Sequence, residues 1–196
     1  MQADLLLWIQ ILNHTSSKGI DINNITFTKE TVVCISDACE HGIGGYNSDG
    51  LAWRWELPEH MKGKFTINLL EFLAAAITIE MTLQSTDTPQ KVLSLTDSTS
   101  ALGWLHKASF PESKPIHDKV ARWLAIKLME KESSLYSQHI AGKFNMIADS
   151  NFCGERQYTE WGSKFYPHSS QSYMKRIKVD ALIFKGGAQT FNSHST

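Results

Sequence analysis

The sequence lacks the features of a secreted, membrane-spanning or DNA-coating protein. Its three cysteines among 196 residues have no regular spacing, so they predict a reducing compartment and no disulfide framework. A net charge of −1 supplies no global basic field for a polyanion. The apolar run at residues 5–9 is too short for a bilayer, and no basic residue precedes it as in a signal peptide. We therefore expect an intracellular protein, cytoplasmic or nuclear, that binds no membrane.

Common short ligand-binding motifs are also missing. The glycines of His41-Gly42-Ile43-Gly44-Gly45-Tyr46 come without a P-loop lysine or a dinucleotide pattern. They predict a tight reversal into a second strand rather than a phosphate cradle. Cys34, Cys39 and His41 lie close together in the sequence, but no fourth zinc ligand follows at a recognisable spacing. A zinc site is therefore disfavoured, and we expect Cys34 to pack on one face of a strand.

What the sequence does contain is a regular succession of strand and helix patterns. A short helix is expected over residues 3–13, followed by the order β-β-β-α-β-α-α-β-α. The expected strands are 31–37, one directly after the glycine reversal, 51–57, 91–96 and 134–140, and the expected helices are 66–83, 98–105, 116–131 and a short one from about residue 145. Strands four and five are each reached through helices, which makes parallel neighbours. The predicted fold class is α/β: a mixed five-stranded sheet, three antiparallel strands then two parallel ones, with helices on both faces.

Four acidic residues lie at the ends of these elements: Asp37, Glu71, Asp97 and Asp149. Two of them have simpler explanations. Glu71, near the first turn of its helix, would interact favourably with the helix dipole, and Asp97 would serve as a helix N-cap. If the fold gathers all four, their carboxylates repel one another, and bound divalent cations remove that cost.

The local sequence around these acids resembles the ribonuclease H domain of retroelement reverse transcriptases, and looks closest to those of retrotransposons. The segments that carry the resemblance are Ser36-Asp37-Ala38 with Gly42-Ile43-Gly44-Gly45, Leu70-Glu71-Phe72-Leu73-Ala74, Thr96-Asp97-Ser98, and the block from His139 to Ser150, which reads H-x-x-G-x-x-N-x-x-A-D. The resemblance covers about residues 30–150. It implies a ribonuclease H-like fold for that part of the chain.

The chain departs from this family in two respects. The final block usually continues as Leu-Ser-Arg in retrotransposons, and here it continues as Asn151-Phe152-Cys153-Gly154. The polymerase motif Tyr-x-Asp-Asp is absent, which predicts a detached domain or a fragment of an element. The expected organisation is an N-terminal helix and linker over residues 1–30, a ribonuclease H-like domain over 31–150, and an unassigned, partly disordered extension over 151–196.

The resemblance implies a two-metal-ion endonuclease that hydrolyses the RNA strand of RNA–DNA hybrids. Asp37, Glu71, Asp97 and Asp149 would hold two Mg²⁺ ions, with Mn²⁺ as a substitute, and Asp37 would bridge both ions. His139 would lie at the rim and assist proton movement or product release, although a plain surface histidine at a strand end is the alternative. The expected partners are the hybrid and a polymerase domain missing from this chain.

Two other functions stay open at this stage. A catalytically decayed or domesticated remnant would bind nucleic acid without cutting it, and the anomalous sequence after Ser150 favours this interpretation. A transposase or integrase core shares this kind of sheet. That class lacks an acid on the first long helix and ends its triad with glutamate, so Glu71 and Asp149 argue against it.

Overall fold

The computed structural model describes residues 2–20, 22, 29–107 and 115–145. The elements in chain order are α1 (Gln2–Lys18), β1 (Val32–Cys39), β2 (Gly42–Asn47), β3 (Ala52–Glu56), α2 (Ile67–Gln84), β4 (Lys91–Thr96), α3 (Thr99–Lys107), α4 (Pro115–Glu130), β5 (Ser134–His139) and a 3₁₀ turn (Gly142–Phe144). Most bounds fall within two residues of the sequence prediction. α1 differs, because it continues to Lys18 where a linker from His14 was expected.

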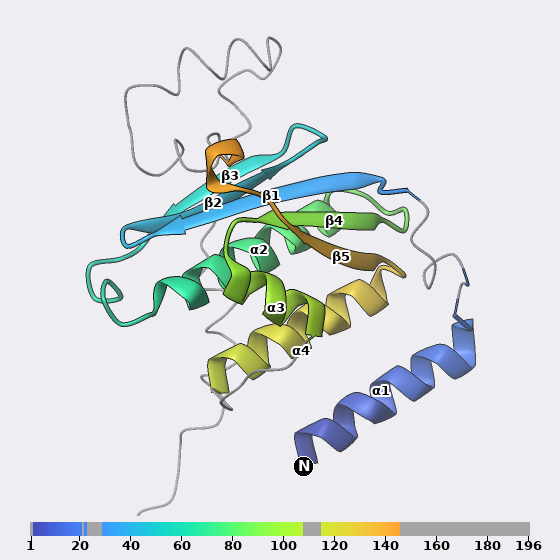
Figure 1. The fold of residues 1–196 in the computed structure, drawn as a ribbon. Coiled ribbons are helices and arrows are strands. Elements are labelled where there is room, and N and C mark those ends of the chain that lie inside the picture. The colour runs from blue at the N-terminus through green and yellow to red at the C-terminus, as the bar shows by residue number, and fades with distance from the viewer. Residues whose placement is uncertain (1, 21, 23–28, 108–114, 146–196) are drawn as a thin grey trace, which may run out of the picture.

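The strands form one mixed sheet in the order β3-β2-β1-β4-β5. β1 pairs antiparallel with β2, and β2 with β3, whereas β1–β4 and β4–β5 are parallel pairs. This confirms the predicted meander followed by two parallel strands. In Figure 1 the helices α2, α3 and α4 lie together on one face of this sheet, so the described residues place helices on one face where the sequence predicts them on both. The further helix expected from about residue 145 lies outside the described residues.

The core helix of the domain is α2. The sequence predicts an apolar stripe along it, yet α2 is buried almost all round, because β1 and β2 cover one side and α3 and α4 another. Thr66 caps its start, where Oγ1 accepts the N–H of Leu69 at 3.4 Å. By length and composition α2 is the one described helix that could cross a membrane, but 83% of it is buried within the domain.

Two threonines of α2 bind it to the sheet. Thr78 Oγ1 accepts a hydrogen bond from Trp53 Nε1 at 3.0 Å, and Thr82 Oγ1 accepts one from Asn47 Nδ2 at 3.0 Å. Cys34 Sγ lies 3.3 Å from the same Thr82 oxygen. Burial raises the pKa of the Cys34 thiol to about 12. Cys34 therefore packs in the core, as predicted, and offers no thiolate to a zinc ion.

The other side of α2 packs against α3 and α4 through aromatic rings. Phe72 and Trp104 meet edge to face with ring centroids 5.7 Å apart. His117 lies edge-on to Trp104 at 4.5 Å and is stacked with Phe72 at 6.4 Å. These contacts fix the start of α2 against α3 and α4, while the opposite side of the helix packs on the sheet.

The glycines of β2 do not form the turn that the sequence predicts. The reversal occurs at Glu40 and His41, and Gly42, Gly44 and Gly45 are all part of the strand. Glycine is needed at position 45 by close packing, because a Cβ there would lie 2.1 Å from Thr78 Oγ1 and 2.7 Å from a backbone oxygen of β1.

We predict that Gly45→Ala lowers the free energy of unfolding by about 1–3 kcal/mol, because the added methyl group overpacks the contact between α2 and the sheet. Urea denaturation measures this. Gly103→Ala is the matched control, since a Cβ at Gly103 in α3 meets no atom within 4 Å. That variant should be as stable as its parent or gain about 0.5–1 kcal/mol, because glycine is a poor helix former. A Gly45→Ala protein of parental stability would contradict the close approach.

Candidate metal centre

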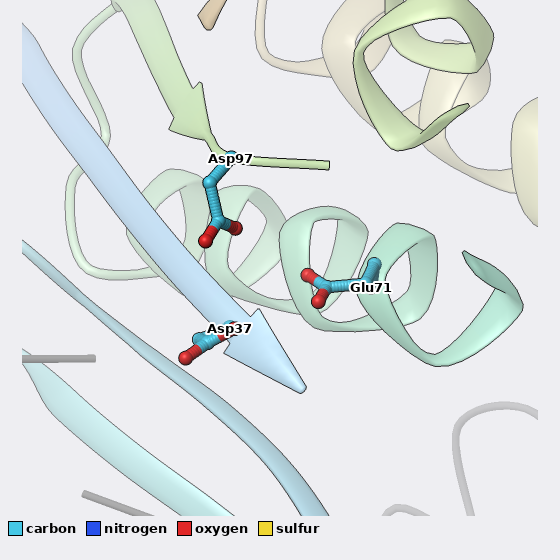
Figure 2. A group of neighbouring side chains, drawn as sticks. All are labelled: Asp37, Glu71 and Asp97. Atoms are coloured by element: carbon cyan, nitrogen blue, oxygen red, sulfur yellow. The ribbon is translucent and has the colours of Figure 1, made fainter. Parts of the chain in front are cut away.

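Three of the four predicted acids converge where β1 and β4 end. Figure 2 shows Asp37 on β1, Glu71 on α2 and Asp97 directly after β4. Each offers a carboxylate oxygen, and the three oxygens all lie within 4.8 Å of one another. Asp149, the fourth predicted acid, lies outside the described residues. Among the described residues this is the one group of His, Cys, Asp or Glu side chains with the geometry of a metal site.

Parallel pairing brings the two aspartates together. The β1–β4 ladder runs from Val32 opposite Val92 to Ile35 opposite Leu95, so both strands end at the same edge of the sheet. The chain then turns into α3, whose cap is Ser98, since Ser98 Oγ accepts the N–H of Ala101 at 3.2 Å. Asp97 is therefore not the N-cap, and its carboxylate remains available to the cluster.

Glu71 is the buried member of the cluster. It lies in the second turn of α2, whose first turn contains no acidic residue, so the helix dipole does not explain it. The residue is 8% exposed, and its Oε2 has no hydrogen-bond partner among the described residues. Burial raises the pKa of Glu71 to about 8, together with the negative charges of Asp37 and Asp97 and a hydrogen bond with Asp37. Without a cation, Glu71 therefore holds its proton at neutral pH.

The end of β5 and the turn after it border the cluster at Asp97 and Ser36. His139 is exposed, and its Nε2 lies 3.2 Å from the backbone oxygen of Asp97. A Cβ on Gly142 would lie 3.1 Å from Asp97 Oδ2. Asn145 is completely buried, and its Nδ2 donates to the backbone oxygen of Ser36 at 3.4 Å. In the sequence, Asn145 is one residue of a motif and a possible helix start. Only the structure shows that it is buried beside β1.

The donor set fits a hard divalent cation. All three side chains offer carboxylate oxygens, which Mg²⁺ and Mn²⁺ prefer. Glu71 Oε2 is buried without a hydrogen-bond partner among the described residues, and the mutual repulsion of the acids is the cost that a bound cation removes. Asp37, Glu71 and Asp97 are therefore the residues that would hold such an ion.

The fold has counterparts among solved structures. The crystal structure of LC11-RNase H1, a protein isolated from compost, in complex with an RNA/DNA hybrid matches with a TM-score of 0.50 and 19% sequence identity, covering 61% of this chain and 92% of that one. The chain has the ribonuclease H-like fold. RNase H1 from the archaeon Halobacterium salinarum (TM-score 0.47, 17% identity, 61% and 92% of the two chains) and the protease-reverse transcriptase of prototype foamy virus (0.36, 16%, 65% and 21%) also match.

No family model matches the chain, and no curated protein matches its sequence. At these identities the structural likeness establishes the ribonuclease H-like fold alone. Any activity has to be argued from the carboxylate cluster.

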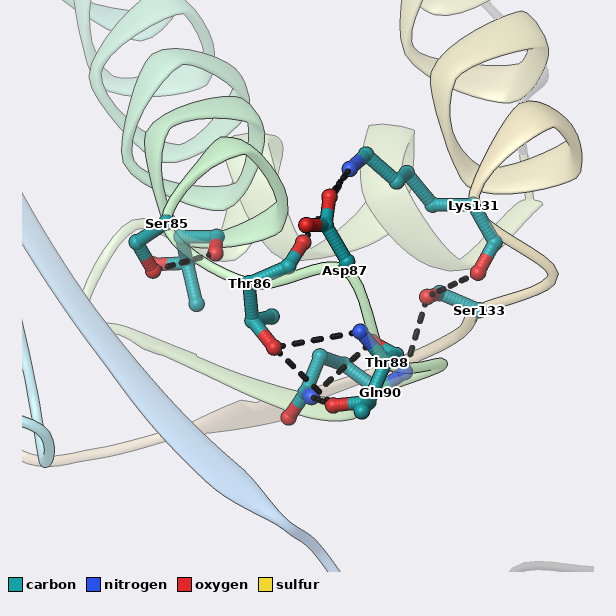
Figure 3. A network of polar contacts seen from close by, with 8 residues as sticks. Ser85, Thr86, Asp87, Thr88, Gln90, Lys131 and Ser133 are labelled. Carbon is teal, nitrogen blue, oxygen red and sulfur yellow. Dashed lines mark hydrogen bonds and ion pairs between the residues drawn. The ribbon is translucent and has the colours of Figure 1, made fainter.

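The opposite end of β4 provides a control region. There the loop before β4 is hydrogen-bonded to the loop before β5 (Figure 3): Lys131 Nζ donates to Thr86 O at 3.0 Å and lies 3.4 Å from Asp87 Oδ1. β4 spans Lys91–Thr96, so at about 3.3 Å per residue this network lies roughly 20 Å from the carboxylate cluster. Asp87 is fully exposed, and its substitution changes a carboxylate without touching the site.

The raised pKa of Glu71 predicts how the stability of the metal-free protein depends on pH. This pKa of about 8 exceeds the usual 4.5, so between these values the folded protein keeps a proton that the unfolded chain has released. The free energy of unfolding should therefore fall as pH rises from about 5 to about 8, by at most about 1.4 kcal/mol per pH unit from this group. Glu71→Gln removes the ionisation, so its stability relative to the parent should rise over the same range.

Urea denaturation in the presence of a chelator, at several pH values across this window, measures the difference. Asp87→Asn should follow the parent at every pH within about 0.5 kcal/mol, because an exposed ion pair contributes little. Excess Mg²⁺ should flatten the pH dependence of the parent by stabilising the ionised cluster. If the advantage of Glu71→Gln is the same at about pH 5 and about pH 8, Glu71 is not the buried acid described above.

Proposed function

We propose that this chain is a metal-dependent endonuclease that hydrolyses the RNA strand of RNA–DNA hybrids. The observation that carries the proposal is the convergence of Asp37, Glu71 and Asp97 within 4.8 Å at one edge of a ribonuclease H-like sheet. The hybrid bound to LC11-RNase H1 supports this choice of substrate. The same proposal includes two further points: this chain is the ribonuclease H domain of a retroelement, and a polymerase domain is a further partner.

The carboxylates would hold two Mg²⁺ ions, which when bound activate a water and neutralise the departing 3′ oxygen in an in-line displacement. Asp37, Glu71 and Asp97 each offer an oxygen within 4.8 Å of the other two, and we assign Asp37 as the ligand that both ions would share, from the resemblance to the ribonuclease H family. Glu71 has to lose its proton when a cation binds, so binding should strengthen as pH rises towards the pKa of about 8. We assign Asp149 to complete the ligand set.

The first test is cleavage of an RNA–DNA hybrid by the purified chain in Mg²⁺. Asp37→Asn, Glu71→Gln, Asp97→Asn and Asp149→Asn should each lower the rate by at least about 100-fold, because each removes a charge that acts on the transition state. Asp87→Asn is the matched control and should cleave at the parental rate. Circular dichroism of every variant checks that the fold is retained.

The outcome also separates the alternatives. Hybrid binding without cleavage by the parent in either Mg²⁺ or Mn²⁺ would favour the decayed or domesticated remnant. Mn²⁺-dependent strand transfer on DNA without an RNA strand would favour the transposase-type core. Parental cleavage rates in the Asp37→Asn and Asp97→Asn variants would refute the metal assignment.

We assign His139 to proton movement at the rim of the site. A backbone carbonyl can only accept a hydrogen bond, so Nε2 is the donor in the contact with the Asp97 oxygen, and Nδ1 is the other ring nitrogen. The exposed ring can therefore exchange protons with solvent and with a product.

His139→Ala should lower the maximal cleavage rate by about 10–100-fold, at the low end of general acid–base effects. Mn²⁺ affinity, measured by titration calorimetry, should fall less than the cleavage rate does, since His139 is exposed and contacts the backbone oxygen of Asp97 rather than its carboxylate. His106→Ala, at another exposed histidine, is the control. Equal losses of rate and metal affinity in His139→Ala would show that the residue supports the site only structurally.

A further inference from the structure

The turn after β5 contacts both strands that carry the aspartates. This segment, Gly142–Asn145, is called the closing turn below. It is closed by the N–H of Asn145, which donates to Gly142 O at 2.8 Å. At one end, Gly142 approaches Asp97 so closely that a Cβ would lie 3.1 Å from Oδ2. At the other end, Asn145 Nδ2 donates to Ser36 O, in the residue before Asp37. The closing turn therefore spans the gap between the ends of β1 and β4.

The Ser36 carbonyl lies beyond the end of the β1–β4 ladder. A Cβ on Gly45 of β2 would meet the backbone oxygen of Ile35 at 2.7 Å, so the Ile35 carbonyl faces β2. Successive carbonyls alternate along a strand, and the Ser36 carbonyl therefore faces β4. The paired residues end at Ile35 and Leu95. A buried carbonyl needs a partner, and the Asn145 amide provides it where the strands separate.

Folding stability alone is a poor explanation for this amide. Asn145 is 0% exposed, and its Oδ1 has no hydrogen-bond partner among the described residues. Its one side-chain hydrogen bond to another described residue, Ser36 O, is long at 3.4 Å. A buried amide with an unsatisfied oxygen is less favourable than an apolar side chain of the same size. Asn145 is better explained by its hydrogen bond to the Ser36 carbonyl, which holds this part of β1 in place.

We propose that Asn145 is a positioning residue that fixes the exit of β1 relative to β4, and so sets the separation of the Asp37 and Asp97 carboxylates. This inference rests on the proposed function, because the separation matters to a bound divalent cation. Asn145 acts one residue away from Asp37, and Gly142 limits Asp97 from the other side. Residues that orient the ligands of a metal typically change its affinity by about 10–100-fold.

Asn47 offers a matched control. It is also 0% exposed, but its amide is satisfied: Nδ2 donates to Thr82 Oγ1 at 3.0 Å, and Oδ1 accepts the N–H groups of Asp49 and Leu51 at 3.0 and 2.9 Å. It is paired with β1 three residues before Asp37, at Cys34. Asn47→Ala should therefore cost stability without moving the carboxylates.

The experiment compares the full chain with Asn145→Ala and Asn47→Ala by two measurements. The first, without metal, is hydrogen exchange of the Ala38 amide by NMR. That amide donates to Asp37 Oδ1 at 2.9 Å, so its exchange rate reports on the carboxylate. The second is Mn²⁺ affinity, measured by electron paramagnetic resonance. Urea denaturation of each variant records stability.

In Asn145→Ala, Ala38 exchange should accelerate at least about tenfold relative to Val33, because the β1 exit opens locally. Mn²⁺ affinity should fall about 10–100-fold. Asn47→Ala should lower the urea midpoint and leave both readouts within about twofold of the parent. Parental exchange and parental affinity in a folded Asn145→Ala protein would overturn the positioning role.

Two further outcomes are decisive. If Asn145→Ala does not fold, Gly142→Ala takes its place, since Gly142 is exposed and its added methyl group reaches Asp97 Oδ2 rather than the core. Unchanged Mn²⁺ affinity in Gly142→Ala would then overturn the proposal. If the parent binds no Mn²⁺ while Asn145→Ala still accelerates Ala38 exchange, the proposed function fails and the positioning of Asp37 by Asn145 stands.

Discussion

Parallel pairing of β1 with β4, from Val32 opposite Val92 to Ile35 opposite Leu95, is the constraint on which the carboxylate cluster depends. It forces two aspartates that are far apart in the sequence to leave the sheet at the same edge. Their charges repel one another. Burial, together with the charges of the two aspartates, also raises the pKa of Glu71 to about 8, so that ionising Glu71 there is unfavourable. The sheet tolerates the cost because the pairing and the packing beneath it involve many residues, whereas the repulsion acts at three side chains.

The position of α2 sets the third side of the cluster. Thr78 binds this part of the helix to the sheet, and the missing side chain at Gly45 allows the close approach. Glu71 lies two turns before Thr78 on the same face of the helix, so the height of α2 over the sheet also determines how far the Glu71 carboxylate reaches towards Asp37. Fold stability and site geometry therefore share one contact surface.

Several local features could not be read from the sequence. The glycines at positions 42–45 suggest a turn, but Gly45 is required by the helix lying beneath it. In the sequence, Glu71 resembles a first-turn residue that interacts with the helix dipole. In the structure Thr66 caps α2, so Glu71 lies in the second turn. Asp97 resembles an N-cap, yet Ser98 takes that role. The alternative roles of Glu71 and Asp97 were decided by which neighbouring residue caps each helix, and that of Gly45 by Thr78, a residue distant in the chain.

The sequence by itself determined the order of strands and helices, the mixed sheet and the identity of the acids, because period-two and helical apolar patterns, crossover connections and motif residues are all local properties. Only the tertiary structure decided that Asp37, Glu71 and Asp97 meet within 4.8 Å, that α2 is buried nearly all round, and that the closing turn contacts Ser36 of β1 and approaches Asp97. Those facts depend on distances across the chain and on the burial of charge, which arise when separate elements pack together.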